Sequence, residues 1–76
     1  MRERVLKAFE EAFDVPADID TATLVYRDYE PWTSIGHMML VAALEAEFDI
    51  MMETDDILAM SDFEKAVAMM EKYAAA

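Results

Sequence analysis

The 76-residue chain has no cysteine, only one glycine and only two prolines. The absence of cysteine excludes a disulfide framework and gives no sign of an oxidising compartment. The scarcity of glycine and proline, together with an apolar content of 57%, is typical of a compact helical domain rather than a disordered chain. We therefore expect one all-α domain that occupies residues 1–76.

Long hydrophobic runs are also missing. The longest, residues 35–44, is interrupted by Gly36 and His37 and is far shorter than the ~20 residues that a membrane span needs. The N-terminal segment MRERVLKAFEEAF is charged throughout and does not have the form of a signal peptide. These features predict a soluble, cytoplasmic protein without membrane insertion, and we expect it to be a monomer.

Positive charge is scarce as well. Six Lys and Arg stand against 17 Asp and Glu, which gives a net charge of −11, and residues 28–64 contain ten carboxylates but no Lys or Arg. Such a surface repels nucleic acid and anionic membranes and attracts basic protein partners at long range. The alternative is a solvated acidic face that serves solubility alone. We expect no nucleic-acid partner.

The small size of the chain argues against an enzyme. A domain of this length buries only roughly 60–65% of the surface that its unfolded form exposes, which leaves little interior for a catalytic cleft. Ser34 and His37 lie one helical turn apart, as a nucleophile and its base would. However, the sequence shows no third residue visibly placed to orient the imidazole, and there is neither a glycine-rich elbow nor an evident oxyanion hole. We predict no catalytic residue, and we expect His37 at the surface.

The many carboxylates do not form a metal-binding motif. An EF-hand requires a glycine at the sixth position of its loop, whereas Gly36 lies inside a predicted helix and away from any acidic series. Glu53, Asp55 and Asp56 are more simply the acidic start of a helix, with loose association of Mg²⁺ or Ca²⁺ as the alternative. We predict no metal site.

Apolar residues at helical spacing predict two long helices joined by a long loop. The first helix spans residues 2–13 and the second spans residues 34–48. The loop between them, residues 14–33, is long for a compact domain, so we expect its own side chains to pin it to the helices. The pinning residues are Ile19, Leu24 and Tyr29. The buried stripe of the second helix is Ile35 or Met38 with Val41, Leu44 and Phe48.

Two shorter helical patterns follow. Residues 54–60 predict a short capped helix with acids in its first turn, where the helix dipole favours them. Ser61 and Glu64 then fit a capping box at the start of a last helix, and the final residues 74–76 are expected to fray. The inward-facing residues of this helix are Phe63, Val67 and Met70.

The first turn of the second helix carries a hydroxyl that capping does not require. Thr33 can cap the helix by accepting a hydrogen bond from a free N–H group. Ser34 is then available for another role, and a phosphodiester on its hydroxyl would lie against the positive end of a long helix. Met39 is expected to face away from the core beside Ile35 and Ala42, among acids, as a docking surface would require.

Residues 32–50, WTSIGHMMLVAALEAEFDI, resemble the helix II region of acyl carrier proteins. The signature of that family is Asp-Ser-Leu followed by an apolar-acidic helix that ends in Leu-Glu-x-Glu-Phe. The match is strongest over residues 40–49, LVAALEAEFD, and the order of the predicted helices extends the likeness to the whole chain. The resemblance implies a four-helix bundle of the acyl carrier type, with a long first loop and a short third helix.

The resemblance also implies a function. A phosphopantetheinyl transferase would attach 4'-phosphopantetheine from coenzyme A to Ser34, and the thiol of this arm would carry acyl groups as thioesters between enzymes. The partners would be acyl-transferring or condensing enzymes with basic docking surfaces. The residues on the docking face would be Ile35, Met38, Met39, Ala42, Glu45 and Glu47, with Glu47 facing solvent.

Some positions differ from the family pattern. Thr33 stands where the family has aspartate, and Met39 replaces a residue that is commonly acidic. Gly36 and His37 resemble stand-alone carriers of specialised pathways, so we expect a dedicated set of partners in a lipid or polyketide-type pathway. Two alternatives stay open: an unmodified acidic helical adaptor that binds a basic protein through Met39 and its neighbours, and an aminoacyl or peptidyl carrier.

Overall fold

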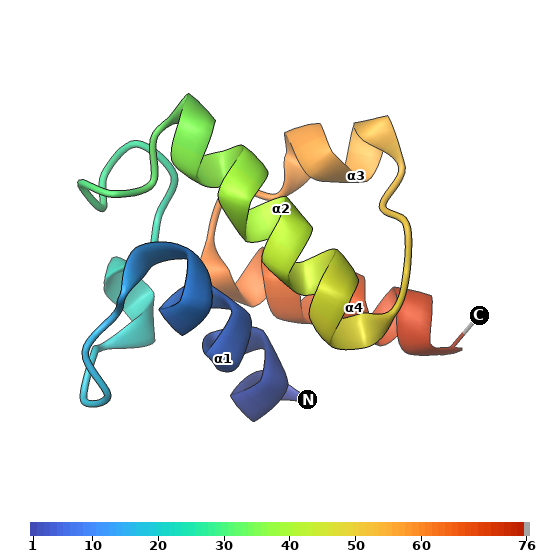
Figure 1. Ribbon diagram of the computed structural model, residues 1–76, viewed down its shortest axis with the longest axis horizontal. Coiled ribbons are helices and arrows are strands. Elements are labelled where there is room, and N and C mark those ends of the chain that lie inside the picture. The colour runs from blue at the N-terminus through green and yellow to red at the C-terminus, as the bar shows by residue number, and fades with distance from the viewer. Residues whose placement is uncertain (76) are drawn as a thin grey trace.

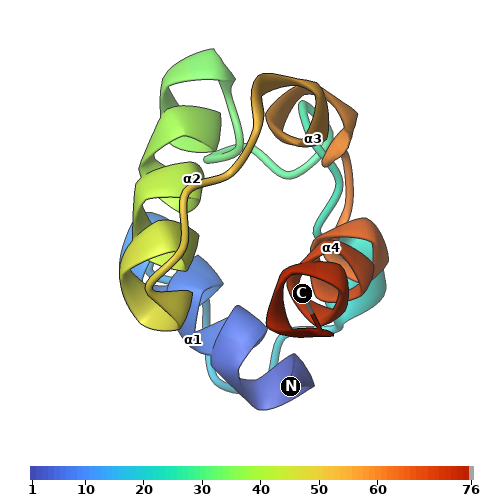
Figure 2. The same cartoon turned by 90° about the vertical axis from the view of Figure 1, so that its right-hand side faces the viewer.

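The computed structural model describes residues 1–75, which form four α-helices (Figure 1). They are α1 (Arg2–Phe13), α2 (Ser34–Phe48), α3 (Thr54–Ala59) and α4 (Phe63–Ala75), with a 3₁₀ turn, η1 (Thr21–Thr23), in the loop between α1 and α2. In Figure 2, α2 and α4 lie on opposite sides, with α1 below and α3 above. The predicted all-α fold with a long first loop and a short third helix is confirmed. Within residues 1–75, no helix combines the length and the apolar character needed to cross a lipid bilayer.

The helices share a core built around aromatic rings. Phe9 of α1 lies at its centre, with its ring centroid 5.2 Å from that of Trp32 and 5.3 Å from that of Phe63. The Phe9–Trp32 pair meets edge to face, which is a favourable geometry for two rings. No polar or charged residue is buried in the part of the chain described. The other large side chains that are fully buried are Leu24, Leu40, Leu44, Met60, Met70 and Val5.

The long loop is pinned by its own side chains, as predicted. Leu24 is fully buried, and Ile19 and Tyr29 are partly buried against the core. Trp32, which the sequence pattern did not single out, is the largest fully buried side chain. It lies in the loop two residues before α2, so its burial anchors the start of α2 to the core.

The backbone of the loop is tied to the start of α4. The N–H group of Tyr26 donates to the carbonyl of Ser61 at 2.9 Å, and the N–H group of Phe63 donates to the carbonyl of Leu24 at 3.0 Å. These bonds form an isolated antiparallel bridge between Val25 and Asp62. The position of Tyr26 is therefore set by the junction of α3 and α4.

The buried face of α2 differs from the predicted stripe. Its buried residues are Gly36, Leu40, Val41 and Leu44, whereas Ile35 and Met38 are exposed and Phe48 is half-buried. The reason lies at Gly36, which approaches the carbonyl of Pro31 so closely that a side chain would not fit. This contact turns Gly36 inward and Ile35 outward, so the prediction of Ile35 or Met38 as a core residue is wrong.

The predicted caps of the last two helices also need correction. Asp62, rather than Ser61, caps α4, because its Oδ1 accepts a hydrogen bond from the N–H group of Lys65 at 2.8 Å. The Ser61 hydroxyl instead accepts from the Lys65 ammonium at 3.0 Å. Residue Glu53 precedes α3, and no side chain caps that helix. Helix α4 continues to Ala75, so fraying is not seen at positions 74 and 75, and Ala76 lies outside the described residues.

Candidate functional site

The first turn of α2 presents an exposed serine beside a capping threonine. Thr33 Oγ1 accepts a hydrogen bond from the N–H group of Gly36 at 3.1 Å, so the predicted cap is confirmed. Ser34 is the first residue of the helix and is exposed. Within residues 1–75, the N–H groups of Ser34 and Ile35 have no protein acceptor. The turn therefore offers an exposed hydroxyl and two N–H groups that have no acceptor within the described chain.

The Ser34 hydroxyl has one side-chain partner, the hydroxyl of Tyr26. The two oxygens are 3.2 Å apart, which is long for a pair of hydroxyls and indicates a weak bond. This contact with Ser34 is the largest cause that lowers the pKa of Tyr26, followed by the neighbouring Arg27. The Tyr26 hydroxyl is therefore held at the edge of the serine site.

His37 is a structural link between three segments. The indole N–H of Trp32 donates to His37 Nδ1 at 2.8 Å, and the two rings stack with their centroids 5.9 Å apart. Because the indole only donates, Nδ1 accepts and the proton lies on Nε2, which donates to the carbonyl of Ile57 at 2.7 Å. Both ring nitrogens are engaged and the residue is half-buried. The expectation that His37 lies at the surface is therefore wrong, and His37 is not placed to act as a base for Ser34.

An exposed apolar surface extends along α2 from Ser34. It consists of Ile35, Met38 and Met39, which are 78%, 57% and 51% exposed, together with the exposed Ala42. Leu58 of α3 is 76% exposed, and the bond between His37 and Ile57 places α3 beside the first turns of α2. The sequence analysis missed Leu58 because α3 is too short for its periodicity to separate an inward from an outward face.

The two acids predicted on the docking face are engaged inside the protein. Glu47 is not solvent-facing: its side chain is 15% exposed, and its carboxylate pairs with Arg4 Nε at 3.0 Å and with Lys7 Nζ at 3.4 Å. The bond to Arg4 is the main cause that lowers the pKa of Glu47. Glu45 Oε2 accepts a hydrogen bond from the N–H group of Met52 at 2.9 Å. Both carboxylates join α2 to other segments and do not form a free acidic rim.

Three acids lie at the start of α3: the carboxylate of Asp56 is bound within the described chain, whereas those of Glu53 and Asp55 are not. Asp56 receives hydrogen bonds from Lys72 Nζ at 2.8 Å and from the Tyr73 hydroxyl at 2.6 Å, which lower its pKa and tie α3 to α4. Glu53 and Asp55 are exposed. Among residues 1–75, no three His, Cys, Asp or Glu side chains gather closely enough to hold a metal ion.

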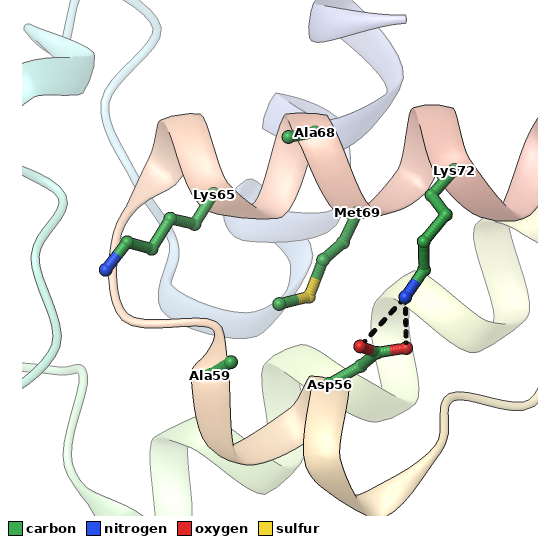
Figure 3. A pocket seen from close by; sticks show the side chains of 6 residues that line it. All are labelled: Asp56, Ala59, Lys65, Ala68, Met69 and Lys72. Carbon is green, nitrogen blue, oxygen red and sulfur yellow. Dashed lines mark hydrogen bonds and ion pairs between the residues drawn. The ribbon is translucent and has the colours of Figure 1, made fainter.

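A groove of about 370 Å³ lies between α3 and α4, and it contains none of the predicted site residues (Figure 3). Its floor is formed by Ala59, Ala68 and Met69. Asp56 and Lys72 pair with each other on one side, and Lys65 extends along the other (Figure 3). The groove therefore offers mainly apolar surface. Sequence analysis had no signal for it, because its residues come from two elements separated by a turn.

Comparison of the chain with protein-family models, with curated proteins and with solved structures gives no match. The functional inference therefore depends on the chain's own residues and their arrangement.

Proposed function

We propose that this protein is an acyl carrier, in which Ser34 bears a 4'-phosphopantetheine arm and the arm's thiol carries an acyl group as a thioester. The observation that carries the proposal is the exposed Ser34 hydroxyl in the first turn of α2, where Thr33 already provides the cap. The resemblance of residues 32–50 to acyl carrier proteins supplies the chemical identity of the arm. The four-helix arrangement, with its long first loop and short third helix, is consistent with a carrier of this type.

The residues around Ser34 fit an anionic phosphodiester. The N–H groups of Ser34 and Ile35 have no acceptor in the described chain, and the positive end of the α2 dipole favours negative charge there. No carboxylate forms a hydrogen bond with the Ser34 hydroxyl, whose one side-chain partner is Tyr26. An arm attached at this position would begin in solvent and be free to reach a partner's active site.

The proposed modification is a phosphoryl transfer. The Ser34 Oγ would attack the phosphorus of coenzyme A that bears the pantetheine, forming the new O–P bond and losing its proton to a base of the transferase. The bond between that phosphorus and the bridging pyrophosphate oxygen would break, and adenosine 3',5'-bisphosphate would leave. His37 would take no part as a base, since its two ring nitrogens are bonded to Trp32 and Ile57.

The proposed docking surface is apolar at its centre. Ile35, Met38 and Met39 of α2 and Leu58 of α3 would contact the partner enzyme, because exposed methionines adapt their shape to a partner at low cost. Asp55 lies one turn before Leu58 on the same side of α3 and would meet a basic partner residue. Glu45 and Glu47 are left out of this surface, because their carboxylates bind within the chain.

A modification assay tests the attachment site. The purified protein is incubated with coenzyme A, Mg²⁺ and a broad-specificity phosphopantetheinyl transferase, and its mass is measured. We expect a gain of one phosphopantetheine unit that is lost in Ser34→Ala and kept in Ser61→Ala. The chain has only these two serines, so Ser61→Ala is a matched control. Circular dichroism should show that both variants keep their helices.

The same exposed apolar surface supports a second candidate, an unmodified adaptor for a basic protein. The mass assay separates the two, because no gain with several transferases would contradict the carrier and favour the adaptor. In the carrier, Met39→Lys should raise the KM of the transferase reaction and leave kcat unchanged, because it removes a docking contact only. Met51→Lys is the matched control, since Met51 is 83% exposed and lies beyond the end of α2.

A further inference from the structure

Tyr26 and Arg27 lie at the edge of the serine site and have no role in the carrier resemblance. The Tyr26 hydroxyl is 3.2 Å from Ser34 Oγ, and the Arg27 guanidinium lies over the Tyr26 ring, 5.7 Å from its centroid. Arg27 is the one Lys or Arg between residues 8 and 64, a segment rich in carboxylates. It forms no ion pair within residues 1–75 and is exposed. A positive charge without an ion-pair partner in the described chain thus lies over the ring of Tyr26, the residue that contacts Ser34 Oγ.

The fold holds Tyr26 at this place from several sides. Its backbone N–H binds the carbonyl of Ser61, as described above, and its ring centroid lies 5.2 Å from that of His37 and 6.2 Å from that of Trp32. The backbone of Arg27 has a φ of 71° and donates to the carbonyl of Trp32 at 2.9 Å. A side chain fixed in this way loses little rotational freedom when it binds a ligand, so its hydrogen bond is more effective.

A phosphodiester oxygen on Ser34 would be a better hydrogen-bond partner for the Tyr26 hydroxyl than the unmodified Ser34 hydroxyl is. A neutral O–H···O contact of 3.2 Å is weak, whereas a hydroxyl that donates to an anionic oxygen forms a shorter bond that is roughly twice as strong. An arginine adds charge and up to five N–H donors for phosphate oxygens.

We propose that Tyr26 and Arg27 are positioning residues for the group on Ser34. In this inference, which rests on the proposed carrier function, Tyr26 orients the free Ser34 hydroxyl and then donates to a phosphodiester oxygen once the arm is attached, while Arg27 pairs with the phosphodiester charge. The two residues hold the base of the arm in one direction relative to α2.

The test uses the loaded protein and ³¹P NMR of its phosphodiester. Wild type, Tyr26→Phe and Arg27→Gln are converted to the phosphopantetheinylated form, with Tyr29→Phe and Arg2→Gln as matched controls. Tyr29 packs its ring on Phe13 with no hydrogen bond from its hydroxyl in the described chain, and the Arg2 side chain pairs with Glu64. We expect the ³¹P resonance to move in Tyr26→Phe and in Arg27→Gln and to stay at the wild-type position in both controls.

A salt titration and loading kinetics distinguish a direct contact with the phosphodiester from a change in the fold. Raising the salt concentration should move the wild-type ³¹P resonance toward that of Arg27→Gln, because screening weakens an exposed ion pair. Tyr26→Phe should lower kcat/KM for loading roughly 2- to 10-fold, the factor that one net hydrogen bond contributes, and circular dichroism should stay unchanged.

A mass gain with the same ³¹P resonance in wild type, Tyr26→Phe and Arg27→Gln would overturn this inference and leave the carrier function standing. No mass gain in wild type with several transferases would overturn both. If Tyr26→Phe does not fold, the Arg27→Gln comparison decides the result alone, since its guanidinium is outside the core.

Discussion

Replacing Gly36 with alanine tests how the start of α2 is built. Glycine in a helix interior is usually less stable than alanine by about 0.5–1 kcal/mol, so helix propensity alone predicts that Gly36→Ala stabilises the protein. The structure predicts the opposite. A Cβ at this position would overlap the carbonyl oxygen of Pro31 and lie 3.0 Å from Cε1 of Phe13.

The overlap cannot be relieved by a small side-chain movement. The Pro31 carbonyl is backbone, and it accepts a hydrogen bond from the N–H group of Thr33 at 3.0 Å. Overpacking of this kind costs about 1–3 kcal/mol. Because the clashing group is rigid backbone, we expect the overpacking cost to lie in the upper part of this range. The propensity gain offsets at most about 1 kcal/mol of it. Gly36→Ala should therefore lower the unfolding free energy by roughly 1–2 kcal/mol.

Urea unfolding measures this change, with Trp32 as the single tryptophan reporter and circular dichroism as the second probe. The variant Ala42→Gly measures the effect of helix propensity alone, because Ala42 is exposed on the same helix. Its unfolding free energy should be lower than that of wild type by about 0.5–1 kcal/mol. A Gly36→Ala variant as stable as wild type, or more stable, would show that α2 does not make the close approach described here.

Three further predictions concern side chains that join the helices. Glu47→Lys should lower the urea midpoint, because it removes the partner of two cations and places a third beside them. His37→Phe should cost about 1–3 kcal/mol, because the buried indole N–H of Trp32 loses its acceptor while the aromatic packing is kept. Asp56→Asn should be less stable than wild type at pH 7, and the difference should shrink as the pH falls below about 4, since the lowered pKa of Asp56 stabilises the fold only while its carboxylate is ionised.

Each of these has its own control. Glu11→Lys makes the same change of net charge at an exposed position of α1, and equal midpoints for it and Glu47→Lys would contradict the ion pairs. For His37→Phe, an unchanged unfolding free energy would show that Trp32 finds another acceptor. For Asp56→Asn, urea unfolding from pH 7 to pH 3 is the measurement, and a difference from wild type that stays constant over this range would contradict the linkage.

The sequence by itself determined the two long helices and the exposed hydroxyl at the start of α2. The spacing of apolar residues is local, and a cap is decided within one turn, so the bounds of α1 and α2, the cap at Thr33 and the exposure of Ser34 could all be predicted. The burial of Leu24 could be predicted because a large apolar side chain in a loop is stabilised by packing against the core. These features depend on residues only a few positions apart.

Only the tertiary structure decided which face of α2 is buried. This helix is apolar on nearly all sides, so its periodicity does not choose between Gly36 and Ile35, and the close approach of Pro31 makes the choice. The partners of Glu47 and His37 were also beyond the sequence pattern, because Arg4 is 43 residues from Glu47 and Ile57 is 20 residues from His37. The partner of a charge or of a ring nitrogen is decided by which distant segments pack beside it, and the local spacing of residues does not contain that information.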